Sequence, residues 1–344
     1  MIYSIFPKHT ATVYERYPKM NTSRDEILEL RKTVSSSEVS GTFNTRILFD
    51  FGLHANSSSM ATDGIVVGAY KLNLYMANEG VPNNSFSYEI GDNAAPWSPG
   101  LGKSTHTPKT SIGVSWNHPS SSVSNWGGQS YPNSTGDITT FVESDRVKDL
   151  RIDVTTLVKD VELSAATDKG LLLRRASANE IDGDHYGYVN FYSTKTPTIY
   201  KPRLEIHYDD STHTTGSLNA VDLVKEYFVY QSNNTSRYKI DSTPKFTFIG
   251  REKYPTATYT ASTAALVEYL PTSSYYSLVD VRTGETVVPF DTTYTKISCD
   301  ATGNFANLKL SGLYPERLYQ FHVRIDHVGT STYHILDDMF RVYE

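Results

Sequence analysis

The side chains that most often perform chemistry are scattered along this 344-residue chain. No Gly-x-Ser-x-Gly element holds a serine on a strained turn, so the sequence offers no obvious nucleophile for a histidine and an acid to activate. No two histidines have the close spacing that places two imidazoles on one metal ion. We therefore predict that the histidines are surface or strand-edge residues, and that His207 and His322 point outward from alternating strands. The ten are His9, His54, His106, His118, His185, His207, His213, His322, His327 and His334.

Two aspartates, Asp182 and Asp184, flank Gly183 in the segment EIDGDHYG (180–187). Their oxygens could contact calcium, but a full calcium loop supplies more acidic residues at fixed spacing. We interpret the segment as a hairpin turn and leave open whether the two aspartates hold a cation. Paired carboxylates can also hydrolyse glycosides, although the sequence singles out no pair. We predict a non-enzymatic protein with no catalytic, cofactor-binding or metal-binding residues.

The three tryptophans, Trp97, Trp116 and Trp126, all lie in a segment rich in Ser, Pro, Gly and Asn (79–148). This composition predicts a long loop region. If the three rings were exposed together, they could form a platform that stacks on sugars. Large aromatic side chains usually stabilise proteins through burial, which favours the alternative that the tryptophans hold the loops against the rest of the protein.

The charge balance argues against a nucleic-acid-binding protein. There are 32 basic and 38 acidic residues, and the net charge is −6, whereas nucleic-acid binders usually present a basic face. The two arginines in LLLRRAS (171–177) are predicted to lie on a solvated surface at the end of a strand. The single cysteine, Cys299, excludes an intrachain disulfide and any all-cysteine metal site; its place in an alternating run predicts a strand residue.

Neither a membrane span nor a secretion signal is predicted. No apolar run approaches the length of about 18 residues that a membrane helix needs. The opening residues, MIYSIFPKHT, lack the basic start and apolar stretch of a signal peptide. We therefore expect the protein to be synthesised in a cytoplasm and to have no membrane insertion.

Apolar and polar residues alternate in many short segments, which is the pattern of half-buried β-strands. Tyrosine, with 25 copies, is far more frequent than Met or Trp, and aromatic residues fit pleated sheets well. Residues 220–228 remain ambiguous between helix and strand. Residues 21–33 could form a helix, because Ser23 and Glu26 mimic a capping box, but we interpret them as strand, since Ile27, Leu28 and Leu30 are too few for a helical stripe. The clearest segments are 45–53, 70–78, 150–158, 170–177, 186–194 and 202–210, and further ones follow between 245 and 344.

The C-terminal segments carry two local signals. Gly284 lies in VRTGETVV (281–288), where it can supply the positive φ of a hairpin turn. The spacing of Leu313, Pro315 and Tyr319 predicts a tyrosine corner, in which a tyrosine near the start of a strand bonds to backbone upstream. The predicted fold is all-β, with a jelly-roll β-sandwich (1–212), a linker (213–219) and a smaller immunoglobulin-like or fibronectin III-like β-sandwich (220–344).

The N-terminal part resembles the DNRLRE-type module. The resemblance covers about residues 1–210, and its motifs are APWSPGLGK (95–103), GVSWNHPSSSVSNWGG (113–128), LRIDVTTLV (150–158), GLLLRRA (170–176) and KPRLEIHY (201–208). It implies a jelly-roll sandwich of a kind found in bacterial surface proteins, carbohydrate-associated proteins and phage virion proteins. It also implies that the tryptophans are framework residues, and it makes a glycan-binding role possible without indicating a site.

Three other segments resemble structural proteins of large tailed bacteriophages: 6–30, REKYPTATYT (251–260) and the long run 290–321. The resemblance implies a structural component of the virion, in the tail, neck or baseplate. Its partners would be other virion proteins and copies of itself. The alternative is a carbohydrate-binding module that contacts glycans on the host surface; a glycan-cleaving enzyme is a third and weaker alternative.

Overall fold

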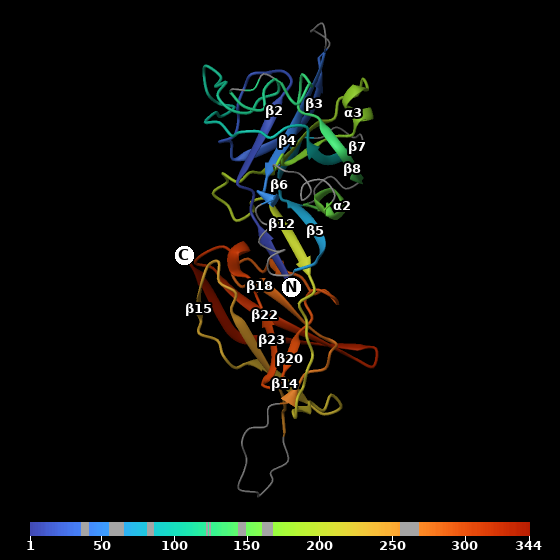
Figure 1. The fold of residues 1–344 in the computed structure, drawn as a ribbon, viewed down its shortest axis with the longest axis vertical. Coiled ribbons are helices and arrows are strands. Elements are labelled where there is room, and N and C mark those ends of the chain that lie inside the picture. Colours follow the sequence, from blue (N-terminus) through green and yellow to red (C-terminus); the bar gives the residue numbers. More distant parts are fainter. Residues whose placement is uncertain are drawn as a thin grey trace, which may run out of the picture. The chain divides into compact units, whose positions relative to one another are not determined.

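The computed structural model describes residues 1–35, 41–54, 65–80, 86–121, 123, 125–143, 149–159, 168–254 and 268–344. These residues form two compact units: an N-terminal unit, Ile5–Glu205, and a C-terminal unit that combines Met1–Ser4 with Ile206–Glu344. Both are built from β-strands, as Figure 1 shows. The all-β fold class predicted from the sequence is confirmed.

The strands of the first 208 residues form one sheet of four strands and one of eight. The smaller sheet has the order β1-β12-β5-β9, and the larger has the order β6-β11-β3-β4-β10-β7-β8, with β2 pairing β4. Their bounds are β1 (Ile2–Ile5), β2 (His9–Tyr14), β3 (Ile27–Val34), β4 (Thr42–Asp50), β5 (Val67–Leu74), β6 (Met76–Gly80), β7 (Phe86–Asn93), β8 (Ser134–Glu143), β9 (Leu150–Asp153), β10 (Leu171–Arg175), β11 (Gly187–Tyr192) and β12 (Arg203–Tyr208). Two short helices, α2 (Thr155–Leu157) and α3 (Ser177–Ile181), complete this part.

Most strand predictions for this part are confirmed, with two corrections. The segment 150–158 is a strand only as far as Asp153, after which α2 begins. The segment 79–148 is not loop throughout, because it contains β7 and β8. The alternation was present in the sequence of β7, where Tyr88 and Ile90 are buried and Glu89 between them is half-buried.

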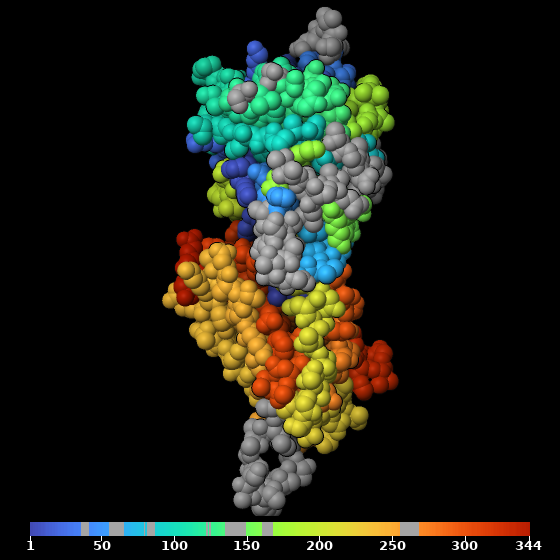
Figure 2. Space-filling view, in the orientation of Figure 1, coloured from blue at the N-terminus to red at the C-terminus, as the bar shows by residue number. Residues whose placement is uncertain are grey.

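The described residues between β7 and β8 (94–121, 123 and 125–133) cover the sheet formed by β2, β4 and β10. Figure 2 shows them in cyan to green as a broad surface. The fully buried side chain of Asn21 anchors this segment through two hydrogen bonds. It donates to the carbonyl of Val114 at 2.7 Å and accepts from the Gly102 amide at 2.9 Å. An irregular segment therefore takes the place of a regular layer over this sheet.

The C-terminal unit contains two further sheets. One has the order β13-β17-β16-β21-β20 with β14 pairing β16, and the other has the order β15-β23-β22-β18-β19. Their bounds are β13 (Asn219–Ala220), β14 (Tyr227–Gln231), β15 (Arg237–Lys239), β16 (Lys245–Glu252), β17 (Glu268–Tyr269), β18 (Ser274–Asp280), β19 (Thr286–Val288), β20 (Ser298–Asp300), β21 (Gly303–Asn307), β22 (Leu318–His327) and β23 (Thr330–Tyr343), with a 3-10 turn, η2 (Leu310–Gly312). The segment 220–228 is thus not a helix.

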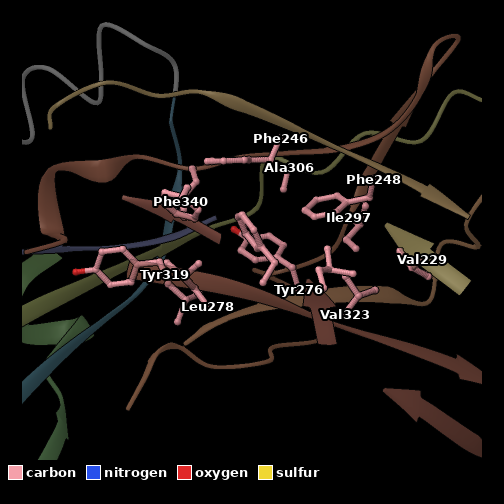
Figure 3. Close-up of a cluster of buried hydrophobic side chains, with 14 of the residues drawn as sticks. Val229, Phe246, Phe248, Tyr276, Leu278, Ile297, Ala306, Tyr319, Val323 and Phe340 are labelled. Carbon is pink, nitrogen blue, oxygen red and sulfur yellow. The ribbon is translucent and has the colours of Figure 1, made fainter. Parts of the chain in front are cut away.

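The core of the C-terminal unit is aromatic. Figure 3 shows Phe246, Phe340 and Tyr276 among the side chains that meet between the sheets. The ring centroids of Phe246 and Phe340 are 4.9 Å apart, and Phe321 lies 4.9 Å from Phe246. These strands divide between the sheets as in immunoglobulin-like sandwiches, with β14, β16 and β21 in one and β18, β22 and β23 in the other.

The unit boundary differs from the predicted linker at 213–219. The two compact units divide between Glu205 and Ile206, within β12. The first four residues belong to the C-terminal unit, where the Met1 ammonium donates to the Tyr208 carbonyl and to Asp210 Oδ1, the latter at 2.6 Å. The polar composition that suggested a linker at 213–219 reflects exposure, because residues there still pair with the body of this unit: the Thr214 amide donates to the Cys299 carbonyl.

Candidate functional site

The segment 180–187 begins inside α3 and is not a hairpin turn, which corrects the prediction. Asp182 follows the helix directly, and its carboxylate accepts from Lys32 Nζ and from the Tyr186 hydroxyl at 2.7 Å. Asp184 is exposed, and its amide donates to Asp182 Oδ1 at 3.1 Å. Within the described ranges, no group of three or more His, Cys, Asp or Glu side chains is gathered closely enough to hold a metal ion.

Lys32 is a fully buried lysine on β3. The alternation of this strand places it on the same face as Leu28 and Leu30, toward the core. Its ammonium donates to the carbonyl oxygens of Asn179 and Asp182, each at 2.6 Å, and to the Asp182 carboxylate. Partial burial opposes ionisation of that carboxylate, but hydrogen bonds led by the one from Lys32 prevail and lower its pKa to about 2. Lys32 thus fastens the end of α3 to β3.

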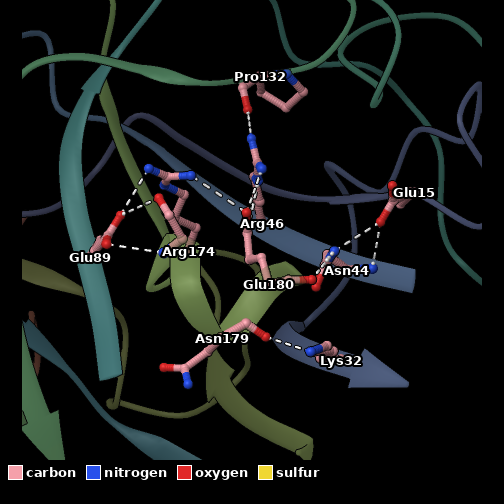
Figure 4. A network of polar contacts seen from close by, with 10 residues as sticks. Glu15, Lys32, Asn44, Arg46, Glu89, Pro132, Arg174, Asn179 and Glu180 are labelled. Carbon is pink, nitrogen blue, oxygen red and sulfur yellow. Dashed lines mark hydrogen bonds and ion pairs between the residues drawn. The ribbon is translucent and has the colours of Figure 1, made fainter. Parts of the chain in front are cut away.

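A buried ionic network lies beside Lys32 (Figure 4). The Glu180 carboxylate accepts two hydrogen bonds from Arg46, from Nε at 3.0 Å and from Nη2 at 2.6 Å. Arg174 Nη1 lies 3.4 Å from the same carboxylate, and Arg174 Nη2 lies 2.8 Å from Glu89. Arg46 also donates to the Pro132 carbonyl. Because both carboxylates are held by arginines, the network ties β4, β7, β10 and α3 together and leaves no free buried charge among these four side chains.

The prediction that Arg174 and Arg175 lie on a solvated surface is wrong. The two residues are only 8% and 1% exposed. Their strand, β10, runs between β4 and β7, so neither of its edges is open to water. The Arg175 guanidinium donates to the Leu30 carbonyl at 3.2 Å and lies over the ring of Tyr186, and burial lowers its pKa to about 10.

A hollow of about 400 Å³ adjoins this network. Arg46 forms part of its wall, with its guanidinium carbon 5.0 Å from the ring centroids of both Trp116 and Tyr131. Glu180 and Arg174 also line it. The charged groups here pair with one another, so the arrangement supplies packing and rigidity.

The interpretation of the tryptophans as framework residues is confirmed. Trp126 is fully buried, Trp116 is 7% exposed and Trp97 is half-buried. The indole of Trp126 donates to the Trp116 carbonyl at 2.9 Å, and both rings pack in a cluster with Leu48 and Leu172. They hold the covering segment onto the sheet and do not form an exposed platform.

His207 does not point outward, contrary to prediction. It is 2% exposed and packs edge-on against the ring of Tyr294, because every residue of β12 is buried. His322 is half-buried on β22, and burial lowers its pKa. Cys299 is a strand residue of β20, as predicted. It is also buried, and burial raises the pKa of its thiol.

The tyrosine corner is confirmed. The hydroxyl of Tyr319, at the start of β22, accepts a hydrogen bond from the Tyr314 amide at 2.8 Å and lies 3.2 Å from the Tyr314 carbonyl oxygen. Gly284 has the predicted positive φ, +72°, in the hairpin between β18 and β19. Both features stabilise the sandwich and neither points to a ligand.

One edge of the C-terminal unit is incompletely paired. β23 pairs β22 along most of its length, but on its other side it pairs β15 only at residues 341–343. Within the described residues, 330–335 therefore have no hydrogen-bonded strand on that side, although β14 approaches β23 and the Tyr227 and Thr332 hydroxyls lie 2.7 Å apart. Tyr333 and Ile335 in this part are 64% and 63% exposed. The run Ser331–Leu336 carries no lysine, proline or acidic residue, which are the usual protections of an edge strand.

Comparisons with known proteins give little further information. No protein-family model matches the sequence, and no curated protein matches it. A DUF4785 family protein from Legionella pneumophila aligns structurally over 99% of this chain and 62% of its own length, with 7% identity and a TM-score of 0.20. A β-glucuronidase from Parabacteroides merdae aligns over 80% and 28%, with 11% identity and a TM-score of 0.16. At such scores neither likeness carries an argument. None of the described helices is long and apolar enough to span a membrane.

Proposed function

We propose that the protein is a non-enzymatic structural component of a tailed-bacteriophage virion, in the tail, neck or baseplate, and that it assembles through its β-sandwich surfaces. The assignment to a phage rests on the sequence resemblance. The observation that carries the assembly role is the open edge of β23, where residues 330–335 lack a hydrogen-bonded strand partner on one side among the described residues.

An open strand edge can bind a strand of a neighbouring virion protein through main-chain hydrogen bonds. The exposed side chains of Tyr333 and Ile335 add apolar contact area to that pairing, and tyrosine does so at low entropic cost. The edge ends at an irregularity of the ladder that lies between Ile335 and Met339 on β23. This part of the strand contains Asp337 and Asp338. The irregularity and the two charges limit the proposed contact to a short segment, which suits a defined neighbour better than open-ended aggregation.

Purified phage particles provide the test. The protein is expected in particles at a fixed stoichiometry by mass spectrometry. Ile335→Lys, supplied by complementation, is expected to reduce its incorporation, because a charge on the edge disfavours strand addition. Val224→Lys is the control, since Val224 is 89% exposed and lies outside this edge. Absence of the protein from particles, or turnover of a substrate by the purified chain, would refute the proposal.

The alternative function, glycan binding, does not find its site at the tryptophans, because Trp116 and Trp126 are buried. A glycan site is better sought at the outer face of β3, where two hollows are lined by polar and aromatic side chains.

A further inference from the structure

The outer face of β3 carries a line of polar and aromatic groups. Alternation directs Leu28, Leu30 and Lys32 into the core, so that Glu29 and Arg31 lie on the opposite face, where both are half-buried. Two hollows lie along this face, of about 350 and 390 Å³. They share Tyr14, Glu29 and Ser104 in their walls, so they adjoin one another, and together they are named the groove.

The groove is long and has a fixed second wall. Its lining includes residues from Ile27 to Ser35, a separation of roughly 26 Å at about 3.3 Å per strand residue. The opposite wall is the segment 103–109, which is held in place where the Ser104 amide donates to both carboxylate oxygens of Asp25, at 3.0 and 3.2 Å. These dimensions suit an extended chain and not a compact small molecule.

Tyr14 occupies the centre of the groove. Burial, together with the carboxylates of Glu29 and Asp25, raises the pKa of its phenol, so the hydroxyl keeps its proton. Within the described part of the chain, this hydroxyl makes no hydrogen bond. Arg31 Nε and Asn190 Oδ1, which belong to lining residues, are also without hydrogen-bond partners there. Unpaired polar groups of this kind favour a ligand that carries both donors and acceptors.

The two halves of the groove differ in charge. The half beyond Tyr14 toward Ser35 contains Arg16, Arg31 and Lys109, against one acid, Glu29. It also contains two aromatic rings, those of Tyr17, which is 46% exposed, and Phe43. The other half contains three acids, Asp25, Glu26 and Glu29, with Lys103 as its one basic residue. A ligand must therefore offer negative charge at one end and neutral polar groups at the other.

From this arrangement we propose that the groove binds an extended oligosaccharide that carries carboxylate groups. Sugar hydroxyls both donate and accept hydrogen bonds, as the unpaired atoms require, and a sugar ring face suits the exposed ring of Tyr17. A nucleic acid is disfavoured, because the three acids would repel its phosphates. A peptide is disfavoured as a strand partner, because β3 pairs β11 on one side. On the other side it pairs β4 at residues 32–34, and the Glu29 and Arg31 amides donate to the Thr12 and Thr45 hydroxyls.

Binding of purified full-length protein to hyaluronan oligomers, in which charged and neutral sugars alternate, tests the proposal. Alginate and polygalacturonate oligomers, which are charged at every sugar, are expected to bind more weakly than hyaluronan because of the three acids in one half of the groove, and cellohexaose is the neutral probe. Acidic chains are expected to bind more tightly with increasing length and more weakly at high salt. Arg31→Met is expected to weaken acidic-chain binding about tenfold or more, and Tyr14→Phe severalfold, since each removes a hydrogen-bonding group. Lys71→Met, whose residue lines neither hollow, should bind as the unchanged protein does.

Circular dichroism and thermal melting of each variant separate lost binding from lost folding. Because the Tyr14 hydroxyl has no partner in the described chain, Tyr14→Phe should fold normally and remain informative if Arg31→Met does not. The proposal is overturned if none of the three acidic probes binds, if poly-glutamate binds as tightly as they do, or if neither Arg31→Met nor Tyr14→Phe weakens binding.

Discussion

Replacing Lys32 with methionine should destabilise the N-terminal unit strongly. Methionine retains an unbranched stem in the fully buried space but removes the ammonium group. The carbonyl oxygens of Asn179 and Asp182, each 2.6 Å from Lys32 Nζ, then lose that donor, and the Asp182 carboxylate loses its cation.

The expected cost follows from these three contacts. Leaving a buried acceptor unpaired costs about 1–3 kcal/mol, and two carbonyl oxygens are affected. The Asp182 side chain is 31% exposed and keeps its bond from Tyr186, so water compensates much of its loss. Methionine also avoids the cost of burying a charge. We therefore expect a loss of about 3 kcal/mol in the free energy of unfolding, which for a unit of this size lowers Tm by about 6–12 °C.

Urea unfolding followed by circular dichroism measures this loss, and Lys71→Met is the matched control. Lys71 pairs with Asp153 at 2.6 Å on the same unit, but both side chains reach solvent, so that change should cost under about 1 kcal/mol.

The pKa of Asp182 is lowered in the folded state, so its stabilising contribution is present above about pH 4 and is lost as the pH falls toward 2. Lys32→Met should weaken this acid dependence. Equal losses in the two variants would refute the reasoning.

Three further predictions concern single side chains. Tyr319→Phe should lower the free energy of unfolding of the C-terminal unit by about 1–2 kcal/mol in urea, because the Tyr314 amide loses its acceptor; an unchanged unfolding midpoint would contradict a stabilising role for the corner. Trp126→Leu should cost about 3–5 kcal/mol by the same measurement, since it leaves a cavity where a fully buried indole lay, and a cost below about 1 kcal/mol would mean that the covering segment is held by other contacts. Hydrogen bonds from Lys245 and Thr302 lower the pKa of Asp300 to about 2, so carboxyl NMR should show this pKa rising toward about 3.9 in Lys245→Met; a value that stays near 2 would remove Lys245 as the main cause.

Local patterns in the sequence predicted the strands well where one face of a strand is buried. β3, β11 and β22 alternate cleanly, because a pleated strand sends successive side chains to opposite faces. The same pattern was present in β7, but the polar composition of the residues around it hid the strand. The tyrosine corner and the Gly284 turn were also predictable, because each depends on contacts between residues close together in the sequence.

Positions that are buried by distant strands were predicted poorly. Arg174, Arg175 and His207 look like surface residues in the sequence, yet all three are buried. Their partners, such as Leu30 for Arg175 and Tyr294 for His207, lie far away along the chain. A sequence window contains no information on which strands lie on either side of a given strand, and that arrangement decides whether a charge is solvated or paired.

The sequence by itself determined the all-β fold, the alternation that sends Glu29 and Arg31 to one face of β3, and the framework role of the tryptophans. Only the tertiary structure decided that Lys32 is buried and that Glu180 contacts two arginines. It also decided that Tyr14 and the segment 103–109 line the groove beside β3. The physical reason is the separation along the chain of the residues that interact. Alternation is a property of neighbouring residues, whereas burial, ion pairing and the shape of a groove arise where segments separated by many residues meet.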